Sequence, residues 1–149
     1  MENSQHDKAI AFRDLHARAG IFVAPNPWDA GSAKLLAALG FEALATTSAG
    51  LAFMLAKPDG EGKITRDEAL SNAASIAAAV DLPVSGDLEN GYGHDPEACA
   101  KTVLMAVAAG LVGCSIEDNT GNPDDPIYPF DLTVQRVKAA VKAARSLSF

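Results

Sequence analysis

Two places in the sequence carry a small hydroxyl and, two residues later, an acid, each at the end of a short apolar segment. They are Ser85-Gly86-Asp87, which Glu89 follows closely, and Ser115-Ile116-Glu117. Successive side chains of a β-strand point to opposite faces, so in each place the serine and the acid share one face. Carboxylates that converge repel one another unless a proton, a hydrogen bond or a cation compensates them. Oxygen ligands without a neighbouring histidine or cysteine suit Mg²⁺ or Mn²⁺, so these residues predict a divalent metal site.

The elements that must position these acids are short apolar segments that alternate with longer, alanine-rich periodic segments. The pattern predicts strands at 21–24, 43–47, 83–87 and 111–116, helices at 7–19, 29–40, 65–80, 95–110 and 131–147, and a long connection at 48–63. This alternation predicts a parallel sheet, because parallel neighbours need a crossover connection. It leaves two α/β architectures open, a doubly wound open sheet and part of a (β/α)8 barrel, and both form active sites at the carboxyl ends of their strands.

Length, charge and cysteine content narrow the class of protein. The 149 residues suffice for one domain, but a complete barrel typically needs about 250 residues. The formal net charge of −7 argues against nucleic acid or an anionic membrane as a partner. No long apolar run and no signal peptide is visible, so we expect a cytoplasmic protein. Cys99 and Cys114 lie among apolar or small residues and are expected to be packed and reduced.

Several polar residues have structural rather than chemical interpretations. Asp29, Asp95 and Asp131 stand at predicted helix starts and are interpreted as caps, and Thr65 with Glu68 forms a capping box. The last helix places three valines on one face, Val134, Val137 and Val141, and its basic residues are expected in solvent, Lys138, Lys142 and Arg145.

Other motifs that could carry chemistry are weak. The glycine-rich segments 60–63 and 91–93 lack the spacing of phosphate-binding loops, so turn glycines explain them. Ser48 has no GxSxG setting and no evident partner base, which argues against a hydrolase triad. We expect His94 just before its helix and in solvent, and Trp28 in packing rather than over a substrate.

Taken in order, the motifs resemble the isocitrate lyase and phosphoenolpyruvate mutase family over nearly the whole chain. The ordered set is specific where Asp87-Leu88-Glu89-Asn90-Gly91-Tyr92-Gly93 is followed one βα unit later by Ser115-Ile116-Glu117-Asp118. The remaining segments that carry the resemblance are Phe22-Val23-Ala24-Pro25-Asn26-Pro27-Trp28-Asp29-Ala30, Thr46-Thr47-Ser48-Ala49-Gly50, Pro58-Asp59-Gly60 and Thr65-Arg66-Asp67-Glu68.

The resemblance implies a (β/α)8 TIM-type barrel, of which residues 1–149 would form the N-terminal half: an N-terminal helix and the first four βα units. It also implies Mg²⁺, a small 2-oxo or 2-hydroxy carboxylate as substrate, and cleavage or formation of a C–C or P–C bond. Asp87 would be the main protein contact of the metal, whose waters would be held by Asp59, Glu89 and Glu117. The substrate carboxylate would be received by Ser48 with the backbone of Ala49 and Gly50, and Asp87 would also belong to the substrate-binding residues. A cation chelated by such a substrate would stabilise the enolate oxyanion formed when the neighbouring bond breaks.

The sequence also departs from the family pattern. Thr46 stands where well-known members carry an aromatic residue, and the segment 119–125 lacks the lysine, cysteine or serine of the lyase and mutase loops. Family members are longer, with a substrate-binding arginine on a fifth strand that this sequence lacks.

Three functions therefore remain open. The first is a Mg²⁺-dependent lyase or decarboxylase-like enzyme, and the second is a catalytically silent chain that keeps the fold and acts as an assembly or binding piece. A flavodoxin-like nucleotide or phosphate binder is the third. An open half-barrel exposes strand edges and an uncovered face, so we expect a homo-oligomer or pairing with a second half-barrel.

Overall fold

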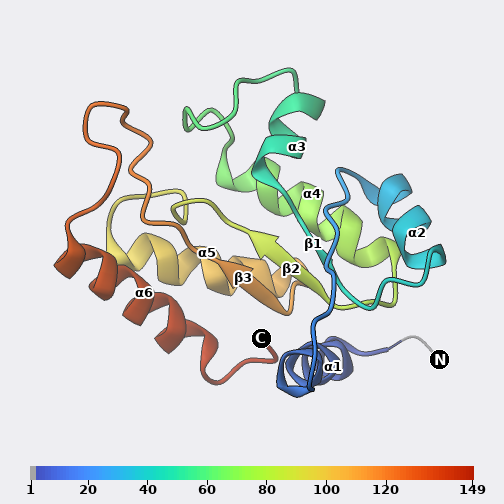
Figure 1. Cartoon of the computed structure of the whole chain (residues 1–149). Helices are drawn as coiled ribbons and strands as arrows, with labels where there is room; N and C mark the ends of the chain where they lie inside the picture. The colour runs from blue at the N-terminus through green and yellow to red at the C-terminus, as the bar shows by residue number, and fades with distance from the viewer. Residues whose placement is uncertain (1–2) are drawn as a thin grey trace.

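Three parallel strands form the sheet of the computed structural model, which describes residues 3–149 (Figure 1). β1 (Leu44–Ala45) pairs with β2 (Val84–Asp87), and β2 pairs with β3 (Gly113–Ser115), with Asp87 opposite Ser115. The strand order follows the sequence without a reversal, which is the order of a (β/α)8 barrel segment rather than of a doubly wound sheet at its switch point. The predicted α/β fold with a parallel sheet is therefore confirmed.

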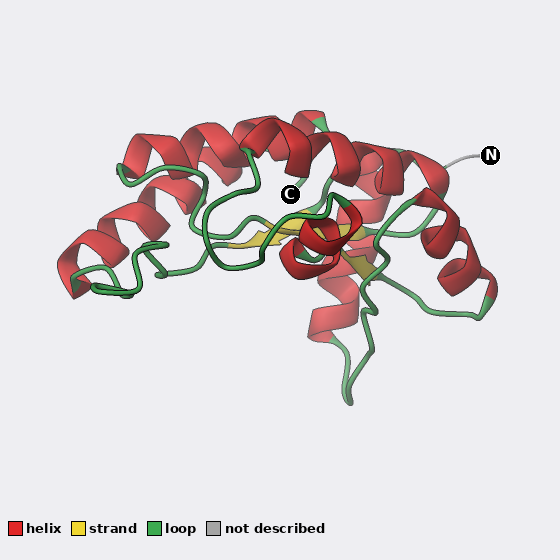
Figure 2. Ribbon diagram, turned by 90° about the horizontal axis from the view of Figure 1, so that it is seen from above, coloured by secondary structure: helices red, strands yellow, loops and turns green. Residues whose placement is uncertain are grey.

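Helices alternate with the strands along the chain. They are α1 (Gln5–Ala17), α2 (Ala30–Ala38), α3 (Ser48–Met54), α4 (Arg66–Ala79), α5 (Pro96–Ala108) and α6 (Phe130–Ala144). Seen from above, α6, α5, α4 and α2 form an arc with the strands on its inner side, and α1 and α3 lie apart from this arc (Figure 2). No helix within residues 3–149 is long and apolar enough to cross a membrane.

The predicted cap residues differ in what their side chains do. Asp29 accepts a hydrogen bond from the Ser32 amide and Thr65 accepts one from the Glu68 amide, each within a reciprocal capping box. Asp95 occupies the N-cap position of α5, but its side chain makes no capping bond there. Asp131 lies inside the first turn of α6, where an acid interacts favourably with the helix dipole.

The hydrophobic core lies between the sheet and the helices α2, α4 and α5. Leu44, Val84 and Leu111 come from the strands or their edges, and Ile76 of α4 packs among them; all are almost completely buried. Alanines fill much of the remaining contact surface, which lets helix and sheet backbones approach closely. Cys99 is buried, Cys114 is partly buried, and both are free thiols, as expected.

The predicted first strand at 21–24 is wrong, because this segment is irregular in the structure. The amide of Ala45 donates to the carbonyl of Pro25 (3.1 Å), so the segment does run beside β1. Pro25 and Pro27 cannot donate backbone hydrogen bonds, and Ile21 is 90% exposed, so the segment has little to pair with or pack against. The described residues thus contain three paired strands and not the four expected.

The structure adds detail to two further predictions. The connection at 48–63 is not irregular throughout, since it begins with α3, which Thr47 caps by accepting from the Gly50 amide. On α6, Val134 is partly buried, whereas Val137 is 43% and Val141 51% exposed. The buried face carries Arg136 and Ala140 instead, because α6 packs closely on α5 through small side chains around Cys99 and Val103. The basic residues Lys138, Lys142 and Arg145 are exposed, as predicted.

Candidate functional site

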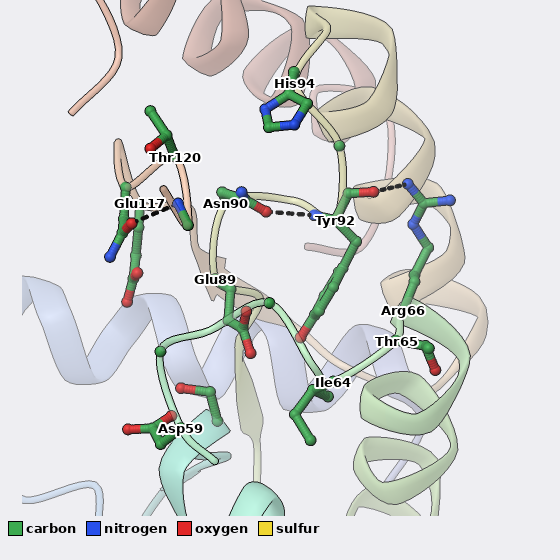
Figure 3. A pocket seen from close by; sticks show the side chains of 16 residues that line it. Asp59, Ile64, Thr65, Arg66, Glu89, Asn90, Tyr92, His94, Glu117 and Thr120 are labelled. Atoms are coloured by element: carbon green, nitrogen blue, oxygen red, sulfur yellow. Dashed lines mark hydrogen bonds between the residues drawn. The ribbon is translucent and has the colours of Figure 1, made fainter. Parts of the chain in front are cut away.

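A pocket of about 640 Å³ opens where β2 and β3 end, as the parallel sheet predicts (Figure 3). Three of the four expected metal-site acids line it, namely Asp59, Glu89 and Glu117. Asp59 belongs to the segment that follows α3, so three separate parts of the chain contribute carboxylates to one cavity. The other lining residues are Ser48, Gly60, Gly62, Ile64, Thr65, Arg66, Asn90, Tyr92, Gly93, His94, Asn119, Thr120 and Gly121.

Asp87, the fourth acid, is not among the lining residues, but its carboxylate is fixed by hydrogen bonds to two residues that are, Ser48 and Glu89. Its Oδ2 accepts from both the backbone amide and the hydroxyl of Ser48, each at 2.8 Å. Its Oδ1 accepts from the Glu89 amide at 3.2 Å, and its own amide donates to the Thr46 hydroxyl at 2.9 Å. The structure therefore brings Ser48 and Asp87 together, and it gives Thr46, where the family carries an aromatic residue, a role in holding Asp87.

Backbone pairing continues beyond the strands and aligns two of the acids. The amide of Glu117 donates to the carbonyl of Glu89 at 2.7 Å, which sets the two residues side by side at the pocket. Glu89 has a φ of 45°, a left-handed conformation that is uncommon for a residue with a side chain. The chain thus turns at Glu89 immediately after β2.

The acids perturb one another's protonation. Burial raises the pKa of Glu89 to about 7, and the negative charges of Asp87, Glu117 and Asp59 add to the rise. Burial, followed by the charges of Asp87 and Asp59, also raises the pKa of Glu117. Like charges gathered in a partly buried pocket favour either protonation or a bound cation.

The donor set fits a hard divalent cation held largely through water. Every acidic ligand candidate offers oxygen, which is the donor that Mg²⁺ and Mn²⁺ prefer. Within residues 3–149, no group of three acidic, histidine or cysteine side chains lies close enough to bind an ion directly. Mg²⁺ commonly keeps several of its waters, so carboxylates spread around a cavity of this size can bind it through them.

The predicted carboxylate-binding segment lies at the start of α3, but its amides are not all free. The Ser48 amide is bonded to Asp87, and the Gly50 amide donates to the Thr47 hydroxyl at 3.2 Å. The Ala49 amide lies in the first turn, where helix amides have no partner within the helix. Ser48 lines the pocket through its side chain.

Trp28 and Gly50 are in close contact beside this segment. A Cβ at Gly50 would lie 2.5 Å from a carbon of the Trp28 ring, so only glycine fits there. The Trp28 ring also lies 6.3 Å from the ring of Phe53 of α3. These contacts confirm the interpretation of Trp28 as a packing residue, although 47% of it remains exposed.

Two residues that hold the pocket loop, Tyr128 and Arg136, had no signal that the sequence analysis used. Tyr128 accepts a hydrogen bond from the Asn90 side chain (3.3 Å), and its hydroxyl lies 2.7 Å from Nδ1 of His94. His94 is largely exposed, as expected, but it is held by this bond. Arg136 reaches the same loop from α6; its position among alanines and valines on a helix was the one available signal.

Comparison with known proteins identifies the family. The family model described as phosphoenolpyruvate phosphomutase matches residues 12–149. The chain belongs to this family. An oxaloacetate decarboxylase of Pseudomonas entomophila (strain L48) is 33% identical over 147 residues, which cover 94% of this chain and 50% of that protein. A protein of Burkholderia cenocepacia J2315 with a known crystal structure is 56% identical in sequence to this chain. The two structures match with a TM-score of 0.93, over 97% of this chain and 51% of the Burkholderia chain.

The same fold occurs in a phosphonopyruvate hydrolase crystallised with oxalate and Mg²⁺. Its TM-score is 0.86 at 23% identity, over 91% of this chain and 48% of that chain. Among the relatives above 30% identity, the oxaloacetate decarboxylase is named for a small carboxylate. The present chain spans about half the length of the relatives that it matches.

In this family member, the loop after Glu117 presents uncharged groups to the pocket. Asn119 pairs with Ile127 in an antiparallel bridge, and the Thr120 amide donates to the Pro126 carbonyl at 2.9 Å. The Thr120 hydroxyl donates to the Asp125 carbonyl at 2.5 Å. The loop is therefore closed on itself and lines the cavity with Asn119, Thr120 and Gly121.

Proposed function

We propose that this chain provides the metal- and carboxylate-binding half of an enzyme that makes or breaks a C–C or P–C bond in a small 2-oxo or 2-hydroxy carboxylate. The observation that carries the proposal is the gathering of Asp59, Glu89 and Glu117 around one pocket, with Asp87 hydrogen-bonded to the lining residues Ser48 and Glu89. Burial, followed by the negative charges of Asp87, Glu117 and Asp59, raises the pKa of Glu89 to about 7, and a bound cation would oppose this rise. Mg²⁺ is the cation that this oxygen donor set and the character of the relatives support best, and Mn²⁺ would use the same donors.

Each of the predicted site residues has a definite part in this proposal. Asp87 would contact the cation, and its orientation is set by the two bonds from Ser48. Asp59, Glu89 and Glu117 would hold the waters of the cation. Ser48, together with the backbone of Ala49 and Gly50, would contact the substrate carboxylate. A bound Mg²⁺ would supply positive charge where negative charge develops on the substrate oxygen as the bond breaks.

Calorimetric titration of the purified chain with Mg²⁺, alone and with oxalate, tests this proposal. We expect binding that strengthens when both are present, because a dicarboxylate can chelate the cation. Asp87→Asn should weaken Mg²⁺ binding at least about ten-fold, whereas Asp131→Asn, a matched acid in the first turn of α6, should not change it. Absence of Mg²⁺ binding, or equal binding by Asp87→Asn, would contradict the proposal.

A second candidate function is that of a catalytically silent assembly piece. The exposed valines of α6 favour it, because apolar side chains in a row on a helix commonly mark an interface. Assaying the 149-residue chain for decarboxylation of oxaloacetate with Mg²⁺ separates the two candidates. Turnover that Asp87→Asn abolishes would remove the silent alternative, and Mg²⁺ binding without turnover would support it.

A further inference from the structure

The loop at 90–94, which lines the pocket after β2, is held by Arg66 of α4, which lines the same pocket. Its Nη2 donates to the carbonyls of Tyr92 (3.0 Å) and Gly91 (3.4 Å), and the first of these bonds is visible in Figure 3. Its Nε donates to the hydroxyl of Thr102 (2.7 Å), and that hydroxyl donates in turn to the Gly91 carbonyl (2.7 Å). Arg66 and the fully buried Thr102 therefore act on the same part of the loop.

Arg136 of α6 holds the rest of the loop. Its Nη1 donates to the carbonyls of Gly93 (2.7 Å) and His94, and its Nη2 donates to that of Asn90. The guanidinium also lies over the Tyr128 ring, 4.1 Å from its centroid. Together the two arginines bind the carbonyls of all five residues from 90 to 94.

This use of arginine is unusual because the positive charges have no carboxylate partner. Arg136 is 1% exposed, and buried charges are normally paired with an opposite charge. Over the part of the chain that the structure describes, neither Arg66 nor Arg136 takes part in an ion pair. A buried charge satisfied only by carbonyls and a ring is unfavourable for stability alone, which points to a purpose in the loop itself.

The loop that the arginines hold has a strained backbone. Glu89, Gly91 and Tyr92 have φ values of 45°, 76° and 56°, and two of the three carry large side chains. Such conformations persist only where the surroundings fix them, and they are concentrated at functional sites. The side chains of Glu89, Asn90 and Tyr92 line the pocket as a result of this backbone path.

We propose that Arg66 and Arg136 are positioning residues, which hold the backbone of residues 89–94 so that the pocket side chains of this loop are set for the ligand. The inference rests on the proposed function for the identity of that ligand. Lysine would keep the charge but could not reach several carbonyls with one planar, forked group, so the role requires arginine. Arg66→Lys and Arg136→Lys are therefore the informative variants.

Hydrogen exchange of the ligand-free chain tests the clamp directly. The amides of Gly91 and Tyr92 donate to the Leu88 carbonyl and to Asn90 Oδ1, so their exchange reports the loop geometry. We expect each arginine variant to exchange these amides at least about ten-fold faster, with unchanged rates in α2. Arg145→Lys, an exposed arginine at the end of α6, should behave like the wild type.

Mg²⁺ and oxalate binding by the same variants tests the positioning role. We expect about ten-fold weaker Mg²⁺ binding in either arginine variant. Leu15→Ala, a core substitution in α1 outside the pocket, lowers stability without touching the loop and should leave the affinity unchanged at a comparable Tm. If Arg136→Lys fails to fold, the same binding measurements on Arg66→Lys decide the question, because Arg66 is partly exposed and its substitution is less disruptive.

The outcomes separate this inference from the proposed function. If wild-type protein binds no Mg²⁺, the proposed function fails, and the exchange rates still decide whether the arginines hold the loop. Unchanged exchange in both variants would overturn the clamp. Faster exchange with unchanged Mg²⁺ affinity, or an equal loss of affinity in Leu15→Ala, would overturn the positioning role.

Discussion

Glu89 combines a place at the pocket with an environment that opposes its charge. Its pKa of about 7 lies well above the ordinary value of 4.5, so between these pH values the folded protein binds more protons than the unfolded chain does. The metal-free protein must therefore lose stability as the pH rises from about 4.5 through about 7. A residue kept at such a cost is expected to serve binding rather than folding.

Glu89→Gln is the substitution that separates these two roles. Glutamine removes the charge repulsion, so at pH 8 we expect the metal-free variant to melt about 3 °C higher, after allowance for solvent screening of a half-buried group. At pH 5, where the wild-type side chain is mostly protonated, the two proteins should melt alike. Mg²⁺ binding at pH 8 should weaken about ten-fold. Thermal melts at both pH values and calorimetry check this, and a lower Tm of the variant at pH 8 would contradict it.

Gly50 offers a second prediction at the scale of single atoms. A methyl group there would overlap the Trp28 ring and the Thr47 side chain, at 2.5 and 2.7 Å. We expect Gly50→Ala to destabilise the protein by about 2 kcal/mol through overpacking, measured by urea unfolding. Gly31→Ala in α2, where the nearest atom would be 3.2 Å away, is the control and should cost much less. Equal effects of the two substitutions would show that the Trp28 contact is relaxed in solution.

Among the elements, α4 is the helix whose start borders the pocket. Thr65 and Arg66 both line the cavity, and the Thr65 side chain closes the capping box with Glu68. Thr65→Ala should lower the free energy of unfolding by about 1 kcal/mol, because it leaves first-turn amides without an acceptor. Ser75→Ala on the exposed part of the same helix should have almost no effect or stabilise slightly. Equal losses in chemical denaturation would assign the effect to the helix as a whole rather than to its cap.

How well the sequence predicts a helix or strand depends on which partners its backbone groups form hydrogen bonds with. The strands at 83–87 and 111–116 and the box at Thr65 follow from local patterns, and the structure confirms them with shorter strands. The apolar segment 21–24 has the composition of a strand, but pairing depends on a neighbour and on backbone amides, and Pro25 and Pro27 directly after the segment have none. The helix α3 was missed because its seven residues follow a strand without a break.

The residues of the candidate site likewise fall into those that the sequence predicts and those that it does not. Acids at strand ends are visible in a sequence, because alternation and topology determine where they lie, and three of the four predicted acids line one pocket. Arg136 and Tyr128 come from a helix and a loop far along the chain, and they reach the pocket loop only through tertiary packing. No local pattern specifies such contacts, so a sequence alone leaves them unassigned.

At the scale of the whole molecule, both flanks of the sheet carry exposed apolar side chains. On one flank, α6 exposes Phe130, Val137 and Val141; on the other, Ile21, Leu35 of α2 and Leu39 at the C-cap of α2 are exposed. Apolar rows on both sides of a parallel sheet are the surfaces that further βα units would cover in a barrel. In the 149-residue chain by itself, these rows are in contact with water, which favours association.

We therefore expect the purified chain to self-associate at micromolar concentration, with the α6 flank of one copy covering the opposite flank of another. The paired substitution Val137→Glu and Val141→Lys leaves the net charge unchanged and should shift the protein toward the monomer in sedimentation velocity. Gln135→Lys with Lys138→Gln changes two exposed polar positions of the same helix, also without changing the charge, and should not. A monodisperse wild-type monomer would show that the exposed valines do not drive association. An oligomer unaffected by the valine pair would place the contact elsewhere, and the sheet edge at β3 would then be the surface to test.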